Sequence, residues 1–140
     1  MKVLVLNGPN LGRLGTRQPE IYGRTTLPEL EEMLRARGKE LGCDVECMQS
    51  DDAGDLIAAL EKTDAGAVIL NPAALTHYSN ELREAVASFK GPVFEVHITN
   101  IYAREPFRRH SLISPVARGS IIGLGIQGYL LALEAAVEAR

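Results

Sequence analysis

Hydrophobic residues follow two alternating patterns along the chain. Short runs that are apolar throughout, such as residues 3–6 and 67–70, are typical of strands in a parallel sheet whose two faces are both covered. Longer stretches between them have apolar residues at every third or fourth position, which is the spacing of an amphipathic helix. We therefore predict strands at residues 2–7, 44–50, 66–71, 93–97 and 119–125, and helices at residues 26–42, 52–62, 79–89 and from about residue 127 onward.

The predicted helices also have recognisable ends. Thr26 and Glu29 have the spacing of a capping box, and Gly42 suits the left-handed residue that ends a helix. Asp52 is placed to cap the next helix. The side chains predicted to face the core are Leu27, Leu30, Leu34 and Leu41 in the first helix, Leu56, Ile57 and Leu60 in the second, Leu82, Val86 and Phe89 in the third, and Ile126, Leu130, Leu133 and Val137 in the last.

The order of the predicted elements indicates the fold class. Five strands that alternate with helices predict an α/β fold with a doubly wound parallel sheet. Right-handed crossovers favour the flavodoxin-like strand order 2-1-3-4-5. The length of 140 residues, without a visible linker, predicts a single domain over residues 1–140. Two connections, at about residues 8–24 and 99–118, are longer than a plain crossover requires, and such loops are usually functional.

Composition and charge narrow the class of protein. Hydrophobic residues make up 46% of the chain and charged residues 24%, which is typical of globular proteins. The net charge of −3 gives no electrostatic reason to expect a nucleic acid or an anionic membrane as partner. Neither a membrane span nor a signal peptide is visible, so we expect a soluble, cytoplasmic protein. Cys43 and Cys47 lie about 13 Å apart on a strand, too far for a disulfide, and are interpreted as packing residues. No metal-ligand spacing is visible.

Polar residues gather where three of the predicted strands end. They occupy residues 7–10, 71–77 and 95–99. In a doubly wound sheet, ligands bind beyond the carboxyl ends of the strands. These three clusters therefore predict a ligand site on one rim of the sheet.

The glycine-rich segment after the first strand does not match a phosphate-binding motif. Its glycines are Gly8, Gly12 and Gly15, so Asn10 stands where a dinucleotide fingerprint needs its second glycine, and no helix is predicted to start there. A P-loop fails as well, because Gly12 comes one position early and is followed by Arg13. We interpret residues 8–24 as a lid that closes over the site.

The lid contains a candidate base. Tyrosine has a pKa of about 10, but a nearby guanidinium favours the phenolate. Arg17 and Tyr22 could therefore form a strong base in a dry pocket. The alternative is a solvated arginine beside a tyrosine packed on the sheet edge, and spacing alone favours that alternative.

The fourth predicted strand contains a candidate acid. Glu95 and His97 share one face of the strand, with Cα atoms about 7 Å apart. A carboxylate there can fix the tautomer of the imidazole, leaving the other nitrogen to act as a general acid. A histidine that is hydrogen-bonded within the core, without a catalytic role, is an equally good interpretation.

The other two histidines have weaker signals. The position of His77 favours a helix-capping role with Thr76 and Ser79, and His110 is expected at the surface. The basic run at residues 104–109 is either solvated or folded over the rim toward an anionic or hydroxylated ligand.

Four stretches of the sequence closely resemble signatures of the type II 3-dehydroquinate dehydratases. They are NGPNLGRLGTRQPEIYG (7–23), NPAALTHYS (71–79), EVHITNIYAREPFRRHS (95–111) and GSIIGLGIQGYLLAL (119–133). The resemblance covers essentially the whole chain. It implies a flavodoxin-like fold and a lyase that needs no cofactor. The implied reaction converts 3-dehydroquinate to 3-dehydroshikimate by anti elimination through an enolate, in the shikimate pathway or in quinate catabolism.

The resemblance also implies catalytic roles. Tyr22 would remove the C2 proton, and Arg17 would keep it ionised. Asn10 would help to hold a water that stabilises the enolate. His97 would protonate the departing C1 hydroxyl, and Glu95 would orient His97.

The resemblance to the family also implies which residues bind the substrate. Asn71, Ile98 and Thr99 would hold the substrate carboxylate, the last two partly through backbone N–H groups. His77 and Arg108 would bind ring hydroxyls.

The family resemblance further implies a homododecamer of four trimers. In it, Glu84 would contribute to the site of a neighbouring subunit. Two positions depart from the commonest family pattern, with Gly12 where asparagine is usual and Glu84 where aspartate is usual. Gly12 would loosen the lid.

Two rival hypotheses remain for the function. One is a flavin- or nucleotide-binding module of the same fold, which the failed phosphate fingerprints oppose. The other is a catalytically dead homologue, which the intact acid, base and arginine oppose.

Overall fold

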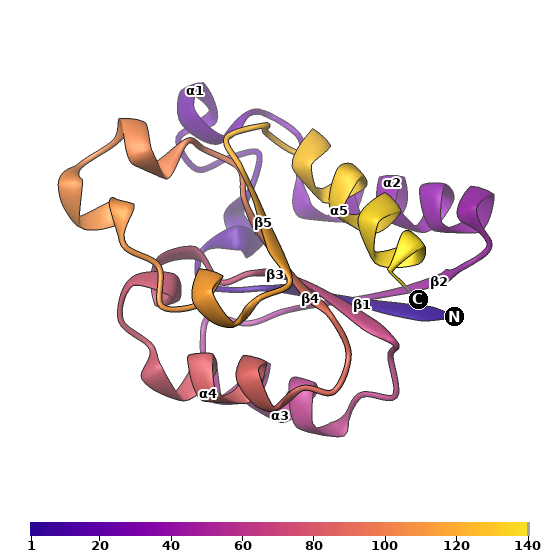
Figure 1. Ribbon diagram of the computed structural model, residues 1–140. Coiled ribbons are helices and arrows are strands. Elements are labelled where there is room, and N and C mark those ends of the chain that lie inside the picture. Colours follow the sequence, from indigo (N-terminus) through magenta and orange to yellow (C-terminus); the bar gives the residue numbers. More distant parts are fainter. Residues whose placement is uncertain (140) are drawn as a thin grey trace.

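The predicted alternation of strands and helices is present in the computed structural model, which describes residues 1–139 (Figure 1). The strands of this part of the chain form one parallel sheet in the order β2-β1-β3-β4-β5. This order confirms the predicted flavodoxin-like topology. Residue 140 of the predicted domain lies outside the described residues. The strands are β1 (Lys2–Asn7), β2 (Asp44–Gln49), β3 (Ala67–Asn71), β4 (Val93–His97) and β5 (Gly119–Ile122).

Helices cover both faces of the sheet (Figure 1). Helices α2 (Leu27–Leu41) and α5 (Gln127–Glu138) pack against one face, and α3 (Ala53–Lys62) and α4 (Asn80–Ser88) against the other. The strands β1, β3 and β4 are therefore buried on both sides, which explains why their sequences are apolar almost throughout.

The predicted helix ends are confirmed. The hydroxyl of Thr26 accepts a hydrogen bond from the backbone of Glu29, whose carboxylate accepts one from the backbone of Thr26 in return. Gly42 ends α2 in the left-handed conformation, with a φ of 77°. Asp52 caps α3 by accepting from the N–H of Gly54. These local signals set where each helix enters and leaves the sheet layer.

The buried face of α5 matches the prediction at Leu133 and Val137, which are buried, and differs from it at Ile126 and Leu130. Ile126 and Leu130 are only half-buried, because small residues allow the helix to lie close to the sheet. A pattern of large apolar side chains does not indicate where such small residues pack. A Cβ atom on Gly128 would lie 3.2 Å from the Cγ2 of Ile121. The predicted Leu41, Ile57 and Phe89 are likewise half-buried at the edges of the core. The buried residues of α5 are Gly128, Tyr129, Ala132, Leu133, Ala136 and Val137.

The two long connections contain short helical turns. In residues 8–24, one turn of 3₁₀ helix follows Asn10, where no helix was predicted, and a four-residue helix ends at Tyr22. The connection between β4 and β5 contains successive 3₁₀ turns in place of the crossover helix of an ordinary βαβ unit (Figure 1). These turns are η1 (Leu11–Arg13), α1 (Pro19–Tyr22), η3 (Ile101–Ala103), η4 (Pro106–Arg109) and η5 (Ser114–Val116).

The cysteines have the predicted packing role. Cys43 is buried in the core cluster between the sheet and the helices α2 and α5, and Cys47 packs against that cluster. Burial, with the negative charge of Glu31 adding to it, raises the pKa of the Cys47 thiol to about 11. Within residues 1–139, no helix has both the length and the apolar character needed to cross a membrane.

Candidate active site

A cavity lies at the carboxyl ends of β1, β3 and β4, between the lid and the β4–β5 connection. The structure brings most of the predicted site residues together there. Glu95 stands behind His97 and does not line the cavity, and Glu84 lies elsewhere, on the exposed side of α4 beside Arg83. The predicted residues that line the cavity are Asn10, Arg17, Tyr22, Asn71, His77, His97, Ile98, Thr99 and Arg108.

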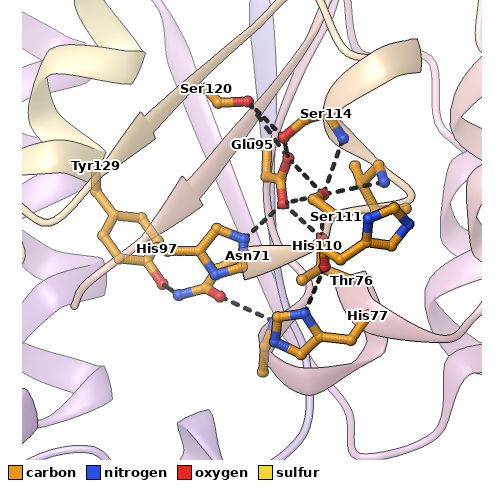
Figure 2. Close-up of polar contacts among 12 residues, drawn as sticks. Asn71, Thr76, His77, Glu95, His97, His110, Ser111, Ser114, Ser120 and Tyr129 are labelled. Carbon is orange, nitrogen blue, oxygen red and sulfur yellow. Dashed lines mark hydrogen bonds and ion pairs between the residues drawn. The ribbon is translucent and has the colours of Figure 1, made fainter. Parts of the chain in front are cut away.

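Glu95 and His97 form a buried pair on β4. The Nε2 of His97 lies 2.5 Å from Oε2 of Glu95, and the two residues are 6% and 0% exposed (Figure 2). Nε2–H donates to the carboxylate, so Nδ1 is the ring nitrogen available to a ligand. The predicted carboxylate–imidazole pair is therefore present at the cavity wall.

Hydroxyl groups surround the carboxylate of Glu95 (Figure 2). The hydroxyl of Thr76 donates to Oε2 over 2.6 Å, and that of Ser111 over 3.0 Å. Ser114, in η5, and Ser120, in β5, donate to Oε1. Sequence reasoning missed the serines, which come from segments well beyond β4, and it assigned Thr76 to a helix cap. Ser79 alone caps α4.

This shell keeps Glu95 ionised. Burial on its own would raise the pKa of the carboxyl, but hydrogen bonds from His97, Ser114 and Thr76, together with the charge of His97, outweigh burial and lower the pKa to about 2. The ionised carboxylate stabilises a positive charge on the imidazole. His97 is therefore equipped to hold a proton and to release it from Nδ1.

Two arginines lie against Tyr22 at the cavity. The guanidinium carbon of Arg17 lies 5.2 Å from the centre of the tyrosine ring, and that of Arg104 lies 5.6 Å from it. Nη1 of Arg104 also donates to the phenol oxygen over 3.0 Å and to Oγ1 of Thr99 over 3.3 Å. The sequence alone indicated the basic run that contains Arg104 but not this residue in particular. The run is irregular, so it has no periodicity that would show which of its residues lies against the lid.

His77 and Arg108 are oriented by neighbouring residues. Nδ1 of His77 donates to the backbone carbonyl of His110 over 2.7 Å, so Nε2 is left for a ligand. His77 is therefore not a helix cap, and His110 is exposed as predicted. Arg108 is held by Glu105, with 2.5 Å between Nε and Oε2, and its guanidinium lies over the ring of Phe107.

Asn10 is held in an unusual backbone conformation at the start of the lid. Its φ of 71° is in the left-handed region, which asparagine tolerates better than most residues. Its N–H donates to Oδ1 of Asp51 over 2.9 Å, and its side-chain oxygen accepts from Arg13. Gln49 donates to the same Asp51 oxygen and to the carbonyl of Gly8. The loop after β2 thus anchors the segment that leads to Arg17.

A model of the dehydroquinase class II family matches residues 1–137. The chain belongs to this family. The class II dehydroquinase match confirms the resemblance seen in the four sequence motifs, and it covers the lid, both members of the buried pair and all of α5 but its last residue.

Similar proteins agree with the family assignment. A 3-dehydroquinate dehydratase of Corynebacterium pseudotuberculosis is 58% identical over 138 residues, covering 96% of this chain and 94% of that protein. The crystal structure of type II dehydroquinase from Propionibacterium acnes superposes with a TM-score of 0.90 at 46% identity, covering 98% and 96% of the two chains. Type II dehydroquinase from Butyrivibrio crossotus gives a TM-score of 0.95 at 39% identity, covering 97% of each chain.

Proposed function

We propose that this class II dehydroquinase removes water from 3-dehydroquinate to give 3-dehydroshikimate, the dehydration step of the shikimate pathway. The observation that carries the proposal is the arrangement of Tyr22 and His97 in one cavity. A phenol faced by two guanidinium groups is suited to remove a proton, and an imidazole backed by an ionised carboxylate is suited to supply one.

The proposed first step is removal of a proton from C2 of the substrate. The phenolate of Tyr22 takes the proton, and the electrons of the C–H bond form an enolate with the C3 carbonyl. Arg17 and Arg104 stabilise the phenolate through their charge. Asn10, at the start of the lid, holds a water that hydrogen-bonds to the enolate oxygen.

The proposed second step expels the C1 hydroxyl. Nδ1–H of His97 protonates this hydroxyl as the C1–O bond breaks, and the enolate electrons form the C1–C2 double bond while the C3 carbonyl is restored. Water leaves, and proton exchange with solvent resets Tyr22 and His97. Glu95 orients the imidazole and stabilises its protonated form.

The remaining cavity residues are proposed to bind the substrate. Asn71, Ile98 and Thr99 hold the carboxylate, the last two partly through backbone N–H groups. Nε2 of His77 and the guanidinium of Arg108 bind the ring hydroxyls, and this is supported by the way neighbouring groups occupy their other polar atoms. No metal or organic cofactor takes part, because the C3 carbonyl of the substrate already acidifies the C2 proton.

Glu84 is proposed to act in a neighbouring subunit. Its side chain is 71% exposed on α4, away from the cavity of its own chain, so a second copy is needed to bring it to a site. A dodecamer of four trimers in the cytoplasm is the proposed assembly. Native mass spectrometry of the wild type and of Glu84→Ala tests this assembly. A wild-type protein that is fully active as a monomer would contradict the proposal.

The stereochemistry of the reaction tests the proposed function. Anti elimination removes the C2 hydrogen opposite the C1 hydroxyl. Substrate deuterated at that position should give unlabelled product, and substrate deuterated at the other C2 position should give labelled product by mass spectrometry. Retention of deuterium in the first case would contradict the assignment, as would the absence of any product.

A further inference from the structure

A chain of buried hydrogen bonds leads from β1 through α5 to the rim of the cavity. The hydroxyl of Tyr129 donates to Oδ1 of Asn7 over 2.6 Å. Nδ2 of Asn71 donates to the same hydroxyl over 2.8 Å (Figure 2), and Oδ1 of Asn71 accepts from the N–H of Ala73 over 3.0 Å. Asn7 and Tyr129 are fully buried, and Asn71 is 3% exposed.

The donors and acceptors in this chain can be arranged in one way only. The backbone N–H of Ala73 can only donate, so the oxygen of the Asn71 amide faces it and the nitrogen faces Tyr129. The phenol has one hydrogen, which must then go to Asn7. Burial raises the pKa of the Tyr129 hydroxyl, so the phenol keeps this hydrogen at neutral pH.

Two unfavourable features accompany the chain. Among the described residues, Nδ2 of Asn7 has no hydrogen-bond partner although it is buried, so this side chain contributes only its oxygen. Ala73 has a φ of 51°, which is a strained conformation for a residue other than glycine. Such features persist where the surrounding contacts hold them in place. Here the contact is the amide of Asn71, which accepts from Ala73 at the start of the turn that leads to His77.

We propose that Tyr129 is a positioning residue, which orients the Asn71 amide and the Ala73 turn so that the cavity binds its ligand in one geometry. Tyr129 does not line the cavity, so it acts through Asn71. The inference rests on the proposed function, in which Asn71 binds the substrate carboxylate. The hydrogen bonds to Tyr129 and Ala73 leave one N–H of Nδ2 and one lone pair of Oδ1 on Asn71 for a ligand. The chain of hydrogen bonds determines the direction in which these two groups point.

Steady-state kinetics of Tyr129→Phe test the proposal, because the variant keeps the ring and removes only the hydroxyl. We expect KM to rise about tenfold, as for the loss of one oriented hydrogen bond, with kcat changed by no more than about twofold. Leu133→Val, in the same buried face of α5, is the control for a loss of packing and should leave KM unchanged. Equal KM values for Tyr129→Phe and the wild type would overturn the proposal.

A double-mutant cycle separates positioning from a general effect on the fold. If Tyr129 acts through Asn71, adding Tyr129→Phe to Asn71→Ala should not raise KM further. A further tenfold rise, so that the two effects multiply, would overturn the proposal.

A measurement on the ligand-free protein keeps the inference distinct from the proposed function. The side-chain amide of Asn71 should exchange its hydrogens at least about tenfold faster in Tyr129→Phe than in the wild type and Leu133→Val, as followed by ¹⁵N NMR. If the protein does not dehydrate 3-dehydroquinate, the proposed function fails while this result still decides the positioning role. Unchanged exchange in Tyr129→Phe would overturn it.

Discussion

Nη1 of Arg104 lies 3.0 Å from the phenol oxygen of Tyr22, and the guanidinium groups of Arg104 and Arg17 both lie over the tyrosine ring. The two arginines therefore differ in geometry although both bring positive charge to the same phenol. Arg104 joins the β4–β5 connection to the end of the lid by a direct hydrogen bond. This hydrogen bond requires both segments to be in place, so we expect Tyr22 to act as a base only in the closed cavity.

Removal of the Arg104 guanidinium should therefore disable the base. We expect Arg104→Ala to lower kcat by at least about a hundredfold, as for other groups that stabilise charge in a reaction. Added guanidinium ion should restore part of the activity by occupying the same place. Arg109→Ala is the matched control on the same segment but outside the cavity, and it should retain full activity. Wild-type kcat in Arg104→Ala would remove this residue from the mechanism.

Replacement of Glu95 by glutamine should impair the acid while conserving shape. The neutral amide does not stabilise a positive charge on His97, and its NH₂ group disturbs the surrounding hydroxyl shell. We expect kcat to fall by about 10²–10³-fold, the lower part of the roughly 10²–10⁴-fold that general acid–base catalysis typically contributes. The exposed Glu32→Gln serves as the control. Full activity of Glu95→Gln would show that the charge on Glu95 is not needed.

Glu95 should also make stability depend on acid pH. Its pKa of about 2 in the folded protein lies below the ordinary value of 4.5, so its contribution is complete above pH 4.5 and is lost as the pH falls toward 2. A difference of this size corresponds to roughly 3 kcal/mol at neutral pH. Urea unfolding of wild type and Glu95→Gln should show a gap in unfolding free energy that narrows over this window. A gap independent of pH between 5 and 2 would contradict the ionised state.

The lid can be tested at Gly12. A Cβ atom there would lie 3.0 Å from Oε1 of Gln49, the flexible end of the side chain that also holds Gly8 and Asp51. Because Gln49 can shift by a few tenths of an ångström, Gly12→Ala should stabilise the protein by about 0.5 kcal/mol through the unfolded chain. Hydrogen exchange in residues 11–23 should become slower. Faster exchange with a lower melting temperature would mean that the added methyl displaces Gln49.

The sequence was sufficient for the elements that depend on local patterns. The strand order follows from the alternation of strands and helices with right-handed crossovers, and the caps of α2 and α3 follow from local cap motifs. The pairing of Glu95 with His97 follows from their spacing within one strand. Contacts between distant segments could not be predicted in this way. Arg104 meets Tyr22 across 82 positions, because the connection that contains it is irregular and gives no register.

Tyr129 was missed for a related physical reason. Small residues bring α5 close to the sheet, so the tyrosine between Gly128 and Leu130 also faces the core, whereas of the residues that the pattern favoured only Leu133 and Val137 are buried. Its contacts with Asn7 and Asn71 span 122 and 58 positions. Likewise, the serines around Glu95 come from the β4–β5 connection and from β5. Polar residues in loops have no periodicity that would indicate their partner.

The most direct test of the account is formation of the conjugated enone product by the protein and by Tyr22→Phe, followed by ultraviolet absorbance. After treatment with a chelator, the wild type should convert 3-dehydroquinate fully, and Tyr102→Phe, half-exposed on η3, should match it. Tyr22→Phe should be slower by at least about a thousandfold, because the substrate proton then has no base to receive it. A rate for Tyr22→Phe equal to that of the wild type would contradict the central claim.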